Sequence, residues 1–154
     1  MKSKGLEFIR KKNLLKKGDS VVLGVSGGAD SICMLKILSD AQKRRDISLY
    51  VLHINHQIRG AEADEDAAFV KRACTKFKVP HRVVSVDVPR IAEEQGMSLE
   101  EAGRMVRYQE FSDYAYEVGA NKIAVAHNSN DNAETVLMNL ARGTGIKGLS
   151  GIAL

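Results

Sequence analysis

Hydrophobic residues gather along the chain in short runs that alternate with longer amphipathic segments. Four runs rich in β-branched residues predict strands at residues 20–25, 48–54, 81–88 and 122–127. Segments with helical periodicity predict helices at residues 6–15, 31–45, 64–77, 89–95, 98–118 and 131–141. This alternation predicts an α/β fold, an open, doubly wound parallel sheet with helices on both faces.

Several of the predicted helix ends are marked by particular residues. Ser98 and Glu101 have the spacing of a capping box, and Gly119 stands where a helix commonly ends. The acidic residues 64–66 favour the positive end of a helix dipole. We therefore expect one helix to begin near residue 64 and another to run from residue 98 to the glycine.

The order of the strands predicts where a ligand binds. Sheets of this kind often have the strand order 3-2-1-4-5, with the ligand outside the carboxyl ends of strands 1 and 4. Strand 1 ends in the sequence SGGADS at residues 26–31, and strand 4 ends in HNSND at residues 127–131. The two most polar loops of the chain are therefore expected to face one crevice.

The SGGADS loop has the composition of a phosphate site. A strand-to-helix turn presents free N–H groups, and glycine lets the backbone approach an anion closely. Asp30 would repel a bare phosphate, but not one that carries Mg²⁺. A capped, glycine-containing turn is the structural alternative. The residues predicted to bind the nucleotide are Ser26, Gly27, Gly28, Ala29, Asp30 and Ser31.

A second group of acidic residues follows strand 4. Asp131 and Glu134 are three positions apart, so they would share one face in the first turn of the predicted helix 131–141. Two carboxylates there could hold Mg²⁺ or orient an ammonium group. Favourable placement beside the helix dipole is the alternative explanation.

Composition and charge limit the class of protein. The chain has 154 residues, which suits one domain, 1–154, and its formal net charge is +4. This charge permits an acidic partner such as nucleic acid. Much of the positive charge lies near the N-terminus, where it forms either a solvated helix face or a patch that meets RNA. The basic residues there are Lys2, Lys4, Arg10, Lys11, Lys12, Lys16 and Lys17.

Neither a membrane segment nor a redox pair is predicted. No apolar run approaches the roughly 20 residues of a membrane helix, and no signal-peptide core follows the first lysines. We therefore expect a cytoplasmic protein. Cys33 and Cys74 are far apart in the sequence, which favours small buried side chains over a disulfide.

The SGGADS loop resembles the SGGxDS signature of the PP-loop, or N-type ATP pyrophosphatase, superfamily. It lacks the Gly-Lys-Ser/Thr of a Walker A loop and does not fit GxGxxG. The resemblance implies a Rossmann-like sheet of the PP-loop ATPase type. It also implies cleavage of ATP between its α and β phosphates, with transfer of AMP to a carbonyl oxygen in most members.

Other segments resemble the N-terminal catalytic domain of bacterial tRNA(Ile)-lysidine synthases. They are HINHQIRGAEADEDAAFV, MSLEEAGRMVRYQEF and AVAHNSNDNAETVLMNLARGTGIKGLSG, and the resemblance runs from about Ser20 to Gly151. It implies ATP and Mg²⁺ as cofactors, and tRNA and L-lysine as partners. The family usually has His-His where this chain has His127-Asn128. Its members also continue beyond the segment matched, so the chain is expected to be truncated at its C-terminal end or naturally short.

The resemblance also implies roles for individual residues. It assigns Asp131 and Glu134 to recognition of lysine, with Asp131 also near the metal beside Asp30. Arg107 would meet ATP phosphate or the activated intermediate, although a surface arginine on a long helix is the alternative. His53 ends strand 2, where the backbone of this superfamily lies along adenine; a structural histidine is the alternative. The loop with His56, Arg59 and Gly60 would close over ATP or touch RNA, and the loop 142–145 would border the active site.

Two other functions remain as alternatives. A tRNA thiolation enzyme of the same superfamily would generally carry a cysteine pair, which Cys33 and Cys74 do not form. A non-catalytic nucleotide-binding module would bind ATP without turnover. Pairing of two chains into a homodimer is also left open by the sequence.

Overall fold

The computed structural model describes residues 17–57, 61–129 and 132–139. Within them, five strands and four helices follow one another along the chain. The strands are β1 (Ser20–Gly24), β2 (Ser48–Asn55), β3 (His81–Ser85), β4 (Lys122–Ser129) and β5 (Asn132–Asn139). The helices are α2 (Ala29–Arg45), α3 (Ala61–Phe77), α4 (Val88–Gln95) and α5 (Leu99–Val118). The helix predicted at residues 6–15 lies outside the described residues.

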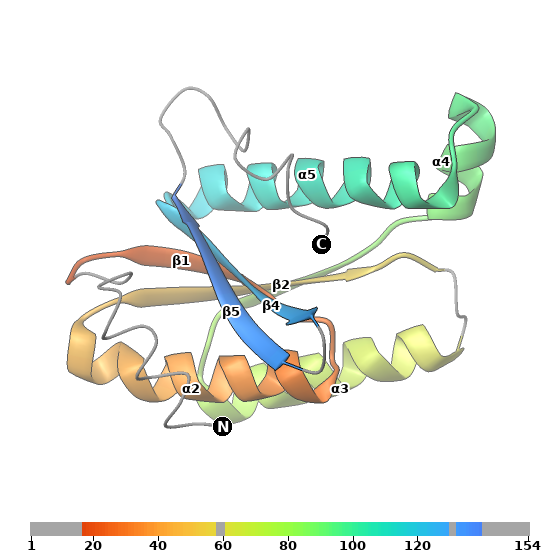
Figure 1. Ribbon diagram of the computed structural model, residues 1–154. Helices are drawn as coiled ribbons and strands as arrows, with labels where there is room; N and C mark the ends of the chain where they lie inside the picture. The colour runs from red at the N-terminus through yellow and green to blue at the C-terminus, as the bar shows by residue number, and fades with distance from the viewer. Residues whose placement is uncertain (1–16, 58–60, 130–131, 140–154) are drawn as a thin grey trace.

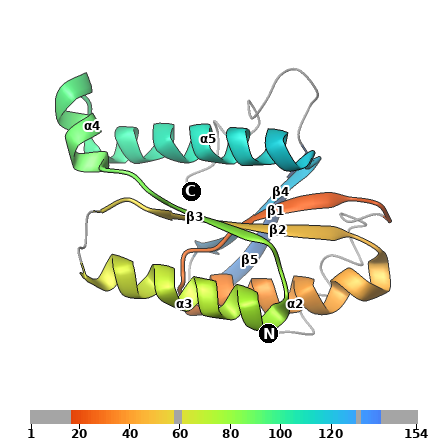
Figure 2. The same cartoon turned by 180° about the vertical axis from the view of Figure 1, so that it is seen from behind.

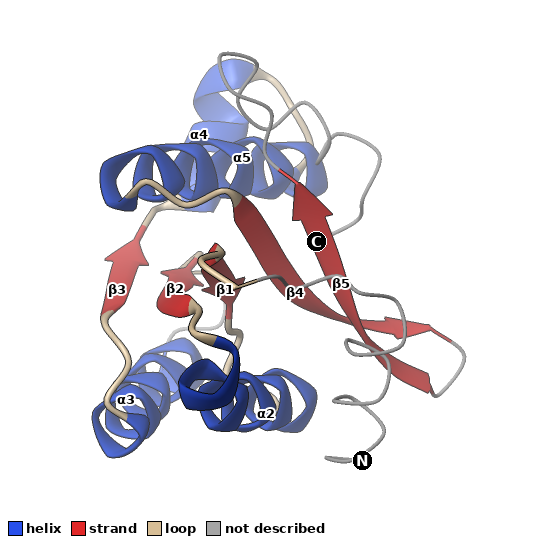
Figure 3. Ribbon diagram, turned by 90° about the vertical axis from the view of Figure 1, so that its left-hand side faces the viewer, coloured by secondary structure: helices blue, strands red, loops and turns tan. Residues whose placement is uncertain are grey.

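The strands form a single sheet in the order β3-β2-β1-β4-β5, which confirms the predicted order of the first four strands and adds a fifth that was not predicted. The first four strands are parallel to their neighbours, and β5 is antiparallel to β4. Helices α2 and α3 cover one face of the sheet, and α4 and α5 lie on the other side (Figures 1 and 2). Viewed along the strands, the molecule is three layers deep, helices over sheet over helices (Figure 3).

The core follows the alternation of side chains along β1. Val21, Leu23 and Val25 point to one face, where they pack with Leu35 and Val70 from α2 and α3. Val22 points to the opposite face and packs with residues of α5. The partners there are Phe111, Tyr114 and Ala115. Both faces of the central strand are therefore buried, which explains its uninterrupted apolar sequence.

Helix ends agree with the sequence at α5 and disagree at α3. The Oγ of Ser98 accepts a hydrogen bond from the N–H of Glu101 at 3.1 Å, and Gly119 ends the helix with φ +70°. Helix α3 begins at Ala61, three residues earlier than predicted. The early start places Asp66 beyond the first turn, so its function as a dipole partner is not supported.

The prediction of a helix at residues 131–141 was wrong, because residues 132–139 form β5. Ala133, Val136 and Leu137 have helical spacing, but so short an apolar run is equally compatible with a strand. Thr135 and Val136 are β-branched, and pairing with β4 satisfies the backbone hydrogen bonds of the segment. In a strand, residues three apart point to opposite faces, so the helical argument for Asp131 and Glu134 no longer holds.

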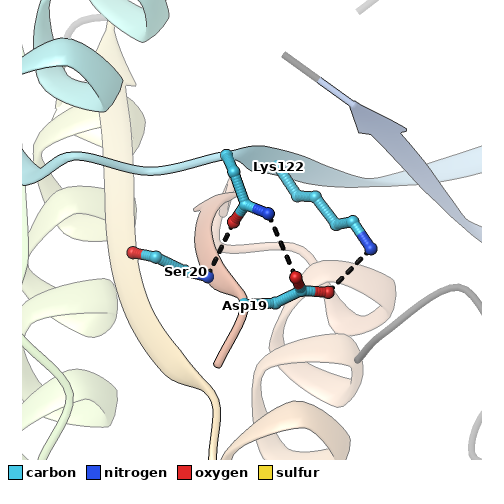
Figure 4. A network of polar contacts seen from close by, with 4 residues as sticks. Asp19, Ser20 and Lys122 are labelled. Atoms are coloured by element: carbon cyan, nitrogen blue, oxygen red, sulfur yellow. Dashed lines mark hydrogen bonds and ion pairs between the residues drawn. The ribbon is translucent and has the colours of Figure 1, made fainter. Parts of the chain in front are cut away.

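A buried polar network closes the amino edge of the sheet (Figure 4). The Nζ of Lys122 lies 2.7 Å from Oδ2 of Asp19, and both side chains are 10% exposed. Asn121 donates from Nδ2 to Oδ1 of Asp19 at 3.0 Å and accepts from the N–H of Ser20 at 2.8 Å. This network fastens the start of β4 to the start of β1. In the described ranges, no helix is long and apolar enough to cross a membrane.

Candidate functional site

The candidate site lies at the carboxyl edge of the sheet, between β1 and β4. The chain leaves β1 toward β2 on one side, while β4 pairs with β1 on the other. Ligands bind at such a reversal of strand order in doubly wound sheets. The residues 26–31, here called the 26–31 loop, follow β1 directly and enter α2 at this place.

The hydroxyl of Ser31 holds the 26–31 loop together from inside. Its Oγ accepts hydrogen bonds from the N–H groups of Ser26 at 3.1 Å and Gly27 at 3.2 Å. It also donates to the carbonyl of Gly28 at 3.1 Å and lies 3.1 Å from Oγ of Ser26. Ser31 is 4% exposed, whereas Ser26 and Gly28 are exposed. The loop therefore presents its backbone at the surface over a buried hydroxyl.

Gly27 brings the loop into contact with α3. Its φ of +94° disfavours any residue with a side chain. A Cβ at Gly27 would lie 3.1 Å from Cβ of Asp66, which is a tighter approach than real contacts normally show. Asp66 thus stands beside the loop, a position that sequence reasoning missed because only packing between α2 and α3 reveals it.

Asp30 and Asp66 supply oxygen atoms on two sides of the loop. Asp30 lies in the first turn of α2 and Asp66 lies against Gly27. Mg²⁺ is usually held in nucleotide sites by one or two carboxylates together with phosphate oxygens and water. Among the described residues, no group of three or more His, Cys, Asp or Glu side chains could hold a metal alone. This donor set fits an ion that arrives with a phosphate.

His53 contacts the residue that precedes the 26–31 loop. The side chain is 4% exposed, and its Nδ1 lies 2.7 Å from the carbonyl oxygen of Val25. A carbonyl can only accept, so Nδ1 carries the proton and donates. The N–H of Val25 in turn donates to the carbonyl of Leu52 at 3.0 Å. The imidazole therefore positions the peptide before the 26–31 loop, and contact of its side chain with a nucleotide stays a prediction.

Arg107 reaches the same edge from α5. Phe111 packs on Gly24, the last residue of β1, because a Cβ there would lie 2.6 Å from its ring. Arg107 is one turn earlier in α5, on the same side of the helix and beyond the end of β1. Burial and the charge of Arg104 lower the pKa of its guanidinium. Within the described part of the chain, Arg107 forms no ion pair, whereas Arg104 pairs with Glu100 at 3.6 Å.

His56 and Asn55 lie where β2 ends. The His56 ring faces Gly103, one turn before Arg107 on α5. Burial lowers the pKa of His56, and the charges of Arg107 and His53 lower it further. Asn55 is 4% exposed, donates to Oδ1 of Asp64 at 3.0 Å and accepts from the N–H of Gln57 at 2.8 Å. Asn55 thus ties α3 to the segment that leads to Arg59 and Gly60, which lie outside the described residues.

Of the second acidic pair, the structure describes only the backbone of Glu134; Asp131 lies outside the described residues. Glu134 is opposite His127 in the β4–β5 ladder. Gly24, at the end of β1, is opposite Val125, so the ladder extends beyond β1 toward the carboxyl edge. Glu134 is therefore on the side of the sheet edge where the 26–31 loop lies. The loop 142–145 also lies outside the described residues.

A family model described as a PP-loop domain matches residues 2–154. The chain belongs to the PP-loop domain family. The 26–31 loop follows β1 and enters α2, as the sequence predicted, and its assignment as the PP-loop of this family stays a prediction.

Curated relatives narrow the comparison within the PP-loop family. The tRNA(Ile)-lysidine synthase of Clostridioides difficile strain 630 is 49% identical over 149 residues, which are 97% of this chain and 32% of that protein. The protein of the same name from Caldanaerobacter subterraneus is 48% identical over 152 residues, 99% of this chain and 32% of that protein. The chain thus spans about a third of the length of these relatives.

A solved structure supports the fold. The U34-tRNA thiolase NcsA from Methanococcus maripaludis, solved with its 4Fe-4S cluster, matches with a TM-score of 0.67. The match covers 84% of this chain and 46% of that one, at 22% sequence identity. Similarity at that level concerns the arrangement of strands and helices only.

Proposed function

We propose that the chain is the catalytic PP-loop domain of an ATP-dependent tRNA-modifying enzyme that forms lysidine. The observation that carries the proposal is the identity of 40–49% to proteins named tRNA(Ile)-lysidine synthase, over nearly the whole chain. The site is compatible with this activity, because a glycine-containing loop, two carboxylates and a guanidinium without an ion pair among the described residues lie at one edge of the sheet. Such an enzyme would act in the cytoplasm.

The proposed reaction has two steps. The C2 oxygen of the wobble cytidine attacks the α-phosphorus of ATP, a P–O bond forms, and pyrophosphate leaves. The ε-amine of lysine, having lost a proton, then attacks C2 and displaces AMP, so that a C–N bond replaces the C–O bond. The enzyme mainly orients the reactants and neutralises charge.

Each group of residues has a place in this proposal. The backbone of the PP-loop, Ser26 to Ser31, holds the phosphates, and Arg107 meets a phosphoryl oxygen with its guanidinium. Asp30 would hold Mg²⁺ from α2, with Asp131 as a further ligand. Bound Mg²⁺ neutralises phosphate charge and orients the phosphates for in-line attack. Asp131 and Glu134 are proposed to bind the lysine ammonium.

The test is a turnover assay with α-labelled ATP, an isoleucine tRNA transcript and lysine. We expect labelled AMP to appear only when both tRNA and lysine are present, with lysidine at the wobble position. Binding of ATP without turnover would favour a nucleotide-binding module.

Changing Glu134→Gln should weaken the apparent affinity for lysine in this assay roughly tenfold to a hundredfold, since one charge-assisted hydrogen bond is removed. ATP binding should change much less in this variant.

Thiolation is the less favoured alternative. A thiolase that uses a persulfide needs a reactive thiolate, and burial raises the pKa of Cys74 to about 11. Cys74 also lies in the core between α3 and the sheet. Sulfur incorporation into tRNA by this chain, instead of AMP release that depends on lysine, would reverse the assignment.

A further inference from the structure

His56 carries a buried nitrogen that the fold does not use. Its Nε2 is inaccessible to solvent and has no hydrogen-bond partner in the part of the chain that the structure describes. An unpaired buried polar atom lowers the stability of the folded state, so such an atom calls for an explanation. The main chain of His56 is well used, because its carbonyl accepts a hydrogen bond from the N–H of Val88 at 3.4 Å. Among the described residues, it is Nε2 of the side chain that lacks a partner.

The side-chain charges that shift the pKa of His56 come from Arg107, on α5, and from His53, on β2, and both lower it. Of the carboxylates on α5 and α3, Glu100 pairs with Arg104 and partly offsets the lowering of the Arg107 pKa, and Asp64 accepts from Asn55. Both His56 and Arg107 have a lowered pKa, to which burial contributes most. Two basic groups held together in this way are stabilised by an anion between them.

The position of the pair identifies the kind of anion. The His56 ring lies against Gly103, and Arg107 follows one turn later on the same side of α5. His53, whose charge also lowers the pKa of His56, donates from Nδ1 to the carbonyl of Val25, which precedes the PP-loop. His56 and Arg107 therefore lie along α5 near the carboxyl end of β1, where the loop that we propose holds the phosphates of ATP begins.

We propose that His56 and Arg107 form one anion subsite, in which Nε2–H of His56 and the Arg107 guanidinium bind a phosphoryl oxygen of the nucleotide on the PP-loop. The proposal rests on the proposed use of ATP. It adds His56 as a binding residue and gives its buried Nε2 an acceptor. A guanidinium and an imidazole N–H can contact the same phosphoryl group from two directions.

The test compares three variants with the unchanged chain. His56→Leu removes the donor, His56→Gln places an amide N–H near the position of Nε2, and His81→Leu is a control at an exposed histidine on β3. The probe is α,β-methylene ATP with Mg²⁺, measured by calorimetry without tRNA or lysine. We expect His56→Leu to weaken binding roughly tenfold to a hundredfold, His56→Gln to restore most of it, and His81→Leu to leave it unchanged.

Stability without nucleotide separates a binding residue from a structural one. Because Nε2 is unpaired, His56→Leu should leave the urea midpoint unchanged or raise it. A lowered midpoint together with unchanged nucleotide affinity would overturn the proposal. So would a loss of tRNA affinity with intact nucleotide affinity, which would assign the subsite to RNA phosphate. Formation of lysidine is not needed for any of these measurements, so failure of the proposed reaction would be seen separately in the turnover assay.

Discussion

Gly27 is the residue within the 26–31 loop at which a single added methyl group should disturb the site most. Its φ of +94° and the contact with Asp66 both exclude a Cβ. We expect Gly27→Ala to lower the free energy of unfolding by about 1–3 kcal/mol, because a strained backbone and a tight contact are introduced together. Urea denaturation of the nucleotide-free chain measures the change.

Gly28→Ala is the matched control for this prediction. Gly28 has φ −73°, and a Cβ there would meet only Oγ of Ser26, at 3.6 Å. The substitution should cost clearly less than the change at Gly27. An equal loss in the free energy of unfolding for the two variants would show that neither the contact with Asp66 nor the positive φ makes Gly27 the more sensitive position.

His56 should make stability depend on pH in a particular direction. Its pKa in the folded chain lies below the ordinary value of 6.5, through burial and the charges of Arg107 and His53. Below pH 6.5 the unfolded chain therefore binds the proton first. The free energy of unfolding should be unaffected by this group above that value and should fall as the pH drops toward the folded-state pKa.

The same variant that tests the anion subsite tests this titration. Urea midpoints between pH 7.5 and roughly pH 5 should decline less steeply in His56→Leu than in the unchanged chain. Parallel pH curves for the two proteins would contradict a lowered pKa at His56. His81→Leu is again the control, because His81 is exposed on β3.

Among the elements, β5 is the one at which the structure and the sequence prediction differ, so it gives a direct test. Residues 132–139 should show the Cα and Cβ chemical shifts of a strand, and Val136 should show cross-strand contacts to Val125 in NMR spectra. Helical shifts over these residues would contradict β5. They would also return Asp131 and Glu134 to one helix face, as the sequence predicted.

Most elements could be predicted from the sequence, because their signals are local. The run of apolar residues in β1, the cap at Ser98 and the glycine at 119 each act within a few residues. The start of α3 and the nature of β5 were missed, since short segments with mixed periodicity depend on their packing partners. Contacts between elements, such as Gly27 with Asp66, have no sequence signal of their own.

At the scale of the whole molecule, a substitution at the amino edge of the sheet should lower folding stability without changing nucleotide affinity at the carboxyl edge. Lys122→Met would remove the ammonium group that lies 2.7 Å from the buried carboxylate of Asp19. We expect a loss of about 3–5 kcal/mol in the free energy of unfolding, toward the lower end because Asn121 still donates to Asp19. Nucleotide affinity of the folded chain should not change, since β1 separates this network from the PP-loop. Urea denaturation and calorimetry on the same sample test both statements.

A double substitution provides the control at the amino edge. Asp19→Asn together with Lys122→Met removes both charges, so part of the lost stability should return. If the loss in the free energy of unfolding in the double variant equals the sum of the losses in the two single variants, the interaction between Asp19 and Lys122 contributes little to stability. A weaker affinity for nucleotide in either variant would mean that the two edges are coupled.

The contacts of Ser31 have a consequence for how a phosphate would enter. The N–H groups of Ser26 and Gly27 already have an acceptor in Oγ of Ser31. If a phosphate binds here, its oxygen atoms would replace Oγ of Ser31 as the acceptor for these two N–H groups. Both N–H groups are hydrogen-bonded before that exchange. Because these hydrogen bonds lie within the loop, its shape is fixed by its own residues, and we expect its conformational entropy to be lost mainly during folding. What the nucleotide must displace is one hydroxyl.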